Sequence, residues 1–163
     1  MTRRYIVLII AAALLISLPS CVSTAEKDEN VANMINPYVN HLSKKEAEKH
    51  VGFSIKLPAE PFETDRVLYR ENIIDPMLEI IMYGGDDDEF RVRKAPGKED
   101  ISGNWTSYPE KKSITIGRDL VKLEGADGKV YQATWTNGMY SYSAFVKNGL
   151  EESAFIDLVS GIR

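Results

Sequence analysis

The chain has 163 residues, with 20 Lys and Arg against 24 Asp and Glu, and a formal charge of −4. A mildly acidic chain of this length indicates one small domain and lacks the basic surface that nucleic-acid binding requires. Its single cysteine excludes a disulfide within the chain, and two histidines leave few ligands for a metal centre.

The first twenty-one residues have the layout of a bacterial lipoprotein signal. Arg3 and Arg4 precede an uncharged apolar run, Tyr5–Leu18, and Cys21 follows a small residue. The run holds 14 residues, whereas a membrane-spanning helix needs about 20. We therefore predict a signal peptide over residues 1–20. Its removal would leave Cys21 carrying a fatty-acyl (palmitate) lipid, which holds an extracytoplasmic domain on the bacterial cell membrane, or on an outer membrane where one is present.

Two features compete with lipidation of Cys21. Pro19 stands where such signals usually carry another small residue, and Ser23–Ala25 offers a site for ordinary signal cleavage that would discard the cysteine. Cleavage before Cys21 would remove two arginines and leave a formal charge of −6. That charge disfavours adsorption on anionic lipid, so the lipid on Cys21 is the predicted membrane contact.

Residues 21–42 are predicted to form the lipid anchor and a polar tether, and residues 43–163 a single domain. The stretch Val22–Asn36 is polar and lacks periodicity, and as a flexible coil it would span about 20 Å. The alternative is a segment that docks loosely through its few apolar side chains.

The first half of the domain is predicted to contain a short helix and several strands. Ser43 and Glu46 form an S-x-x-E capping box, which predicts a helix to about His50. Within the last strand of this half, Arg91 and Arg93 are expected to point away from the core. Alternation of apolar and polar residues predicts strands at residues 53–57, 66–72, 77–83 and 90–93.

The second half is predicted to form three hairpins that share one buried face. Their turns are expected at Asn137-Gly138, at Asp127-Gly128 and near Arg118. A two-residue turn at Asp127-Gly128 would place Glu124 beside Tyr131 on the buried face, so a three-residue loop with a glycine bulge is preferred. The preferred pairings are Trp135 with Tyr140, Ala133 with Tyr142, Leu123 with Tyr131, Val121 with Ala133, and Ile116 with Val121.

Residues 148–162 carry apolar side chains at helical spacing, with Asn148 as the predicted cap. This amphipathic helix is expected to cover the aromatic face of the sheet. The predicted fold class is therefore α+β: a curved antiparallel sheet of about six or seven strands, covered by a C-terminal amphipathic helix and preceded by a short N-terminal helix.

No pattern in the sequence indicates a catalytic or metal-binding centre. His41 and His50 lie nine residues apart, which is a poor helical spacing for two ligands, so surface histidines and no metal site are predicted. The acidic run Asp86–Glu89 lacks the interleaved spacing of a calcium loop and indicates a solvated hairpin tip, with weak calcium binding as the alternative. Without a nucleophile elbow or a phosphate-binding loop, we expect no enzyme activity, no catalytic residue and no cofactor.

The long loop predicted over residues 95–107 is the candidate binding site, because large side chains on exposed loops often mark recognition surfaces. Two alternatives remain: Trp105 folds back as a plug over one end of the core, and Asp100 or Ser102 accepts hydrogen bonds from the loop's own backbone. The candidate partner-binding residues are Lys94, Lys98, Glu99, Asp100 and Trp105.

The segments Gly52–Pro58, Arg93–Gly103 and Ala133–Gly138 resemble a bacterial family of unknown function. That family occurs in extracytoplasmic lipoproteins and in the outer portions of anti-sigma-factor-like membrane proteins, mainly in Gram-positive lineages. The resemblance spans about residues 44–163. It implies a small α+β domain with a sensing or scaffolding role, and it assigns no functional residue.

The predicted function is non-enzymatic binding or sensing of an envelope protein or component. The first alternative is a carrier or sensor of an apolar small molecule, held in a cavity between sheet and helix. The second is a hydrolase of envelope polymers, which requires two carboxylates that converge in a groove.

Overall fold

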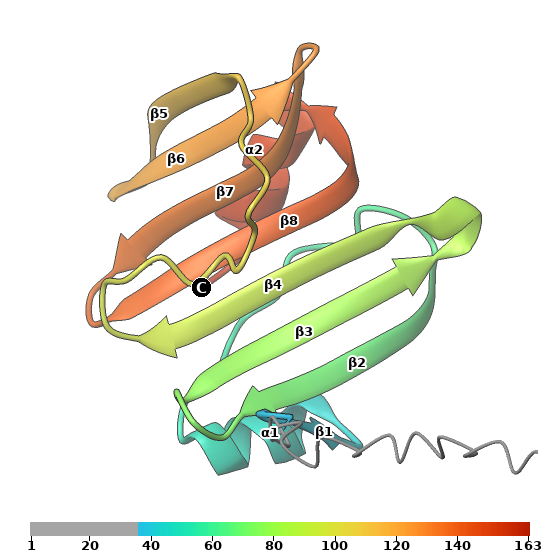
Figure 1. Cartoon of the computed structure of the whole chain (residues 1–163), viewed down its shortest axis with the longest axis vertical. Helices are drawn as coiled ribbons and strands as arrows, with labels where there is room; N and C mark the ends of the chain where they lie inside the picture. The colour runs from blue at the N-terminus through green and yellow to red at the C-terminus, as the bar shows by residue number, and fades with distance from the viewer. Residues whose placement is uncertain (1–35) are drawn as a thin grey trace, which may run out of the picture. The chain divides into compact units, whose positions relative to one another are not determined.

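A computed structural model describes residues 36–163, which form one antiparallel sheet and two helices (Figure 1). The strand order β1-β2-β3-β4-β8-β7-β6-β5 joins two meanders through the pairing of β4 with β8. The predicted α+β class with a curved antiparallel sheet is confirmed, but the sheet has eight strands rather than about six or seven. The elements are β1 (Tyr38–His41), α1 (Lys44–Val51), β2 (Thr64–Asn72), β3 (Met77–Gly84), a 3-10 turn η1 (Gly85–Asp87), β4 (Glu89–Pro96), β5 (Glu110–Ile116), β6 (Asp119–Ala126), β7 (Lys129–Asn137), β8 (Tyr140–Glu151) and α2 (Glu152–Ser160).

The core lies on one face of the sheet, and α2 covers that face as predicted. Phe155 and Leu158 of α2 are buried in the same cluster as the strand residues Trp135 and Tyr142. The rings of Trp135 and Tyr142 stack with their centroids 5.2 Å apart. Full burial of a Phe or Leu side chain contributes about 1.5–3 kcal/mol, so the apolar stripe of α2 is sufficient to hold the helix on the sheet.

The helix α1 begins and ends as its sequence predicts. The Ser43 Oγ accepts a hydrogen bond from the Glu46 N–H at 3.2 Å, which confirms the N-cap. The Glu48 Oε1 accepts hydrogen bonds from the Lys44 Nζ at 2.8 Å and from the Ile55 N–H at 2.9 Å. The second of these bonds ties α1 to the chain segment that follows it.

That segment is extended but is not a strand of the sheet, so the strand predicted at residues 53–57 is wrong. Ile55 is buried in the core, and only Lys56 pairs its backbone, with Arg163 at 2.7 and 3.2 Å. The alternation of apolar residues is real, but it arises because the segment lies across the core face instead of at a sheet edge. The strand that the sequence did not predict is β1, which lies within the tether predicted over residues 21–42.

The hairpins keep their predicted faces but differ in register. Trp135 pairs with Tyr142 rather than with Tyr140, and Ile116 pairs with Asp119 rather than with Val121. Each shift is two residues, which leaves every side chain on its predicted face because strand side chains alternate with period two. The turn between β5 and β6 begins at Gly117, one residue earlier than predicted, and the turn between β7 and β8 begins at Gly138, one residue later. These glycines have φ of +65° and +62°, as tight hairpin turns require.

The turn between β6 and β7 has two residues, Asp127-Gly128, so the preferred three-residue loop is wrong. Both residues have positive φ, 54° and 74°, as a type I′ turn demands. An irregularity in the ladder leaves Tyr131 out of register and brings Leu123 opposite Ala133. A bulge, rather than a longer loop, therefore keeps the apolar residues on the core face.

The end of the chain differs from its prediction in where the helix starts. The strand β8 continues to Glu151, and α2 begins at Glu152 rather than at Asn148. The Asn148 side chain does not cap the helix, because its Nδ2 donates a hydrogen bond to the Asp88 Oδ1 at 2.7 Å. Neither helix within residues 36–163 is long and apolar enough to cross a membrane. The predicted signal peptide, Cys21 and most of the tether lie outside the described residues.

Candidate functional site: a tryptophan on a braced loop

The chain between β4 and β5, residues 97–109, runs over the sheet face opposite to α2 (Figure 1). We call this segment the 97–109 loop. At its start the Gly97 N–H donates to the Met139 carbonyl at 2.8 Å, and the Ser141 Oγ donates to the Gly97 carbonyl at 3.1 Å. The loop is therefore fixed to β8 where it leaves the sheet.

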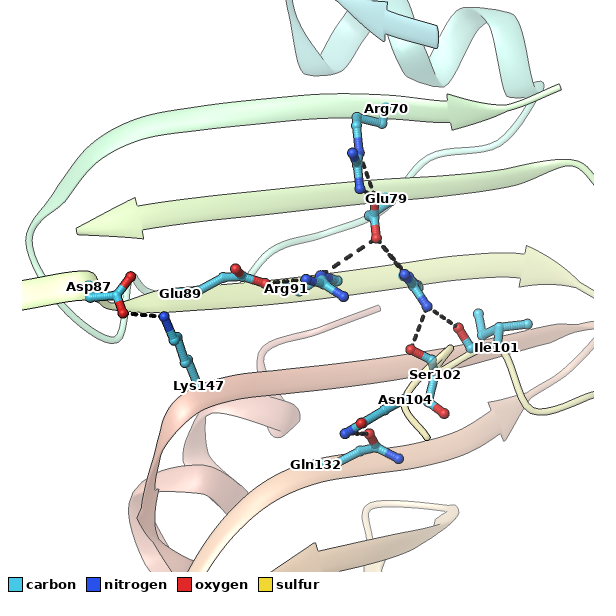
Figure 2. Close-up of polar contacts among 11 residues, drawn as sticks. Arg70, Glu79, Asp87, Glu89, Arg91, Ile101, Ser102, Asn104, Gln132 and Lys147 are labelled. Atoms are coloured by element: carbon cyan, nitrogen blue, oxygen red, sulfur yellow. Dashed lines mark hydrogen bonds and ion pairs between the residues drawn. The ribbon is translucent and has the colours of Figure 1, made fainter. Parts of the chain in front are cut away.

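A buried carboxylate, Glu79, lies on β3, on the face of the sheet over which the loop also runs (Figure 2). Its Oε2 accepts a hydrogen bond from the Arg70 Nε at 2.6 Å, and its Oε1 accepts one from the Arg93 Nε at 2.8 Å. The Arg91 Nε is 3.6 Å from the same Oε1. Strand register explains the cluster, because Arg70, Glu79 and Arg93 are opposite one another on β2, β3 and β4.

Three arginines around one carboxylate satisfy a charge that could not otherwise be buried. The predicted outward direction of Arg91 and Arg93 is right in that both lie on the face away from the core. Arg93 is nevertheless only 7% exposed. The loop and the neighbouring strands cover it.

Arg93 connects this buried cluster to the loop. Its Nη1 donates to the Ile101 carbonyl at 3.0 Å and also to the Ser102 carbonyl. Gly103 has a φ of +56°, and a Cβ added there would lie 2.2 Å from the Arg93 Nη1. The Asp100 Oδ1 accepts a hydrogen bond from the Ser102 N–H at 2.8 Å, which confirms the predicted contact within the loop.

The next residues fix the loop to the strands below it. The Asn104 Nδ2 donates to the Gln132 Oε1 at 2.8 Å and to the Tyr108 hydroxyl at 3.3 Å. The Tyr108 ring stacks on the Tyr131 ring with centroids 5.4 Å apart. Tyr131 is free to do so because it is the residue at the bulge, outside the regular alternation of β7.

Trp105 stands between these two fixed residues and is 98% exposed. The expectation that it folds back as a plug over the core is wrong. The indole contacts water over almost its whole surface, although the backbone on both sides of it is held by hydrogen bonds and stacking. Such exposure is unusual, because tryptophan is among the most buried residues on average. This combination makes Trp105 the centre of the candidate site.

A shallow hollow of about 320 Å³ lies between the loop and the outer strands β6 and β7. The exposed side chains of Leu120 and Met139, 61% and 77% exposed, flank this part of the surface. The surface therefore combines apolar groups with charges of both signs, as protein-binding surfaces do. The hollow is lined by Lys98, Glu99, Asp100, Leu120, Lys122, Glu124, Thr134, Trp135, Thr136 and Tyr142.

Four of the five predicted site residues lie on this segment, but only three of them line the hollow, because Trp105 is not among its lining residues. Lys98, Glu99, Asp100 and Trp105 belong to the loop. Lys94 belongs to β4 and is buried, with its Nζ 2.6 Å from the Ser54 carbonyl oxygen and 4.5 Å from the centre of the Tyr140 ring. The sequence predicted its loop too early, because β4 continues to Pro96. Lys94 is thus a core-face residue.

The two histidines meet, which the sequence did not predict. His41 is on β1 rather than on α1, so the helical spacing that argued against a pair does not apply. The two ring centroids are 4.7 Å apart, and the His41 Nε2 is 3.0 Å from the Glu71 Oε2. Strand pairing supplies this third residue, since His41 and Glu71 lie on the adjacent strands β1 and β2.

The acidic hairpin tip contributes to the sheet instead of forming a cation loop. Asp87 is paired with Lys147, and the Asp88 carboxylate accepts a hydrogen bond from Asn148. Each of these two carboxylates thus has its own partner on β8. The described contacts fit the predicted solvated tip better than shared coordination of calcium.

The hollows described in residues 36–163 are open to solvent. The most apolar of them, about 330 Å³, lies between α2 and the segment around Pro58 and Pro61. The layer between sheet and α2, where the small-molecule alternative requires a cavity, is occupied by buried side chains such as Phe155 and Trp135.

A scan against protein-family models and searches of curated proteins and of solved structures found no match to this chain. The geometry of the 97–109 loop is therefore the main basis for assigning a function.

Proposed function

We propose that this chain is a non-enzymatic, lipid-anchored binding domain, and that the 97–109 loop with Trp105 at its centre binds an envelope protein. One observation carries the proposal: an almost fully exposed tryptophan is presented by a loop whose backbone is tied to a buried ion cluster. The proposal assigns no catalytic residue and no cofactor.

The energetic argument begins with the exposed indole. A tryptophan buries roughly 200 Å² when it is enclosed, which at about 25 cal/mol per Å² corresponds to about 5 kcal/mol before the costs of binding. Interface hot spots are enriched in tryptophan for this reason. Covering Trp105 with a partner would release that free energy.

The bracing of the loop lowers the cost of binding. Ordering a flexible loop consumes part of the interaction energy, whereas a preorganised one retains it. The contacts of Arg93, Asn104 and Tyr108 hold the backbone on both sides of Trp105. A loop used only as a connection has no need of such bracing around a solvated indole.

The location of the partner rests on the sequence alone. Arg3, Arg4, the apolar run and Cys21 indicate export and lipid attachment, so the partner belongs to the cell envelope. The resemblance to extracytoplasmic lipoproteins and anti-sigma-factor-like proteins supports a sensing or scaffolding role of the same kind.

Site-specific photo-crosslinking in the producing cell tests the proposal. A benzophenone amino acid replaces the exposed Thr106, next to Trp105, in one variant and Leu42, which is 97% exposed, in a control. We expect one discrete crosslinked protein with the probe at position 106 that is absent with the probe at position 42 and is lost when Trp105→Ala is added. Identical patterns from the two positions, or no crosslinked protein from position 106, would refute the proposal.

A further inference from the structure

The geometry points to a binding site for Zn²⁺, or a similar transition-metal dication, formed by His41, His50 and Glu71, with Glu46 beside them. His41 ends β1, Glu46 and His50 lie in the first and last turns of α1, and Glu71 is on β2. This site is independent of the 97–109 loop and of its proposed partner.

The measured separations suit tetrahedral coordination. Bonds of about 2.0–2.2 Å from zinc to nitrogen and oxygen place neighbouring ligand atoms about 3.3–3.5 Å apart. The Glu71 Oε2 is 3.0 Å from the His41 Nε2 and 3.7 Å from the His50 Nδ1. Both distances lie within about 0.5 Å of this value.

Glu46 is a further candidate ligand beside the two histidines. Ligand atoms of His41, Glu46 and His50 all lie within 4.8 Å of one another. The Glu46 Oε2 accepts a hydrogen bond from the Leu42 N–H at 3.0 Å, which holds its carboxylate near the two rings. Carboxylate ligands of metals are usually oriented by such contacts.

The chemistry of the donors selects the metal. Two imidazole nitrogens with carboxylate oxygens suit Zn²⁺, Cu²⁺ or Ni²⁺, whereas Ca²⁺ and Mg²⁺ prefer all-oxygen sites. The C-terminal end of α1 carries partial negative charge beside His50, which also favours a cation. The His41 side chain is only 5% exposed, and that of Glu71 is 17% exposed, so the site is partly shielded from water.

The consequence for the fold is a bridge between three elements. A metal held by these residues would link the edge strand β1 to α1 and to β2, in addition to the backbone pairing of β1 with β2. Binding would therefore stabilise the edge of the sheet by mass action, because the unfolded chain does not hold the four residues together.

Calorimetric titration of the full chain in detergent with ZnCl₂ tests the inference. The informative variant is His50→Ala, because the His50 side chain is 57% exposed and its removal leaves the fold intact. The neighbouring Lys49→Ala is the matched control, since Lys49 is exposed and is not a ligand. We expect one Zn²⁺ per chain, affinity at least tenfold weaker in His50→Ala and in Glu71→Gln, and unchanged affinity in Lys49→Ala.

A second measurement separates this site from metal binding elsewhere. The chain has only two histidines, so their imidazole NMR signals report on the site directly, and both are expected to shift until one equivalent of Zn²⁺ is added. Absence of saturable binding, wild-type affinity in His50→Ala, or binding abolished by Cys21→Ser instead would overturn the inference.

Discussion

The substitution Glu79→Gln tests the buried ion cluster that is joined to the 97–109 loop through Arg93. It keeps the side-chain shape but removes the charge that faces Arg70, Arg91 and Arg93. Removing one partner of a buried ion pair lowers the free energy of unfolding by about 3–5 kcal/mol, because the remaining charge stays unpaired in the protein interior. The Arg70 and Arg91 side chains are 26% and 28% exposed and can turn toward water, whereas that of Arg93 is 8% exposed. We therefore expect the lower end of that range, about 3 kcal/mol.

Urea unfolding followed by circular dichroism measures this loss. With a slope of about 2 kcal/mol per molar urea, the midpoint should fall by about 1.5 M. The control is Glu124→Gln, whose partner Lys111 is 3.1 Å away and 58% exposed, and it should cost about 0–1 kcal/mol. A loss in Glu79→Gln no larger than in Glu124→Gln would refute the reasoning that the cluster holds the loop and the sheet together.

Three further predictions concern the loop, its tryptophan and α1. Gly103→Ala should destabilise the chain by more than Gly138→Ala in urea unfolding, because the two glycines have similar φ, +56° and +62°, but only at Gly103 would a Cβ collide with a side chain; equal losses would contradict the close approach. Trp105→Ala should change the free energy of unfolding by less than about 0.5 kcal/mol and remove the long-wavelength, easily quenched part of the fluorescence, leaving that of buried Trp135; a larger loss would show that the indole packs on the fold. Burial acts to raise the pKa of Glu48, but the hydrogen bonds that it accepts from a lysine and a backbone N–H lower it from 4.5 overall. The Glu48 carboxylate should therefore stabilise the fold above pH 4.5, and this effect should be lost as the pH falls through its folded-state pKa. The free energy of unfolding of Glu48→Gln should therefore fall less than that of the unsubstituted chain between about pH 5 and 3. An equal fall in both proteins would contradict this prediction.

The hairpins show which part of the fold the sequence could predict. The faces of Trp135, Leu123 and Ala133 follow from alternation, because a shift of one residue would expose every apolar side chain. A shift of two residues leaves the same side chains buried, so alternation cannot distinguish the two registers. The geometry of the turn decides between them. The turn at Gly138 and the bulge at Tyr131 depend on backbone conformations that residue type only suggests.

The candidate site was predictable in part for a similar reason. The loop and Trp105 were identified because a large aromatic residue among turn formers is conspicuous in a sequence. The exposure of Trp105 depends on the contacts of its loop with Arg93 and Gln132, which lie on the neighbouring strands β4 and β7 and which local patterns do not reveal. The meeting of His41 with Glu71, 30 residues apart, likewise needs the pairing of β1 with β2.

The seam between β4 and β8 has a consequence for how the protein reaches its native state. Phe90 and Val92 on β4 pair with Val146 and Ala144 on β8, more than fifty residues later. The first meander can assemble before the final strand is in place, and until then the apolar edge of β4 has no partner strand. Contacts this distant in sequence form slowly. A folding chain would thus expose an unpaired, aggregation-prone strand edge until β8 pairs with β4, and a chaperone would be most useful during this interval.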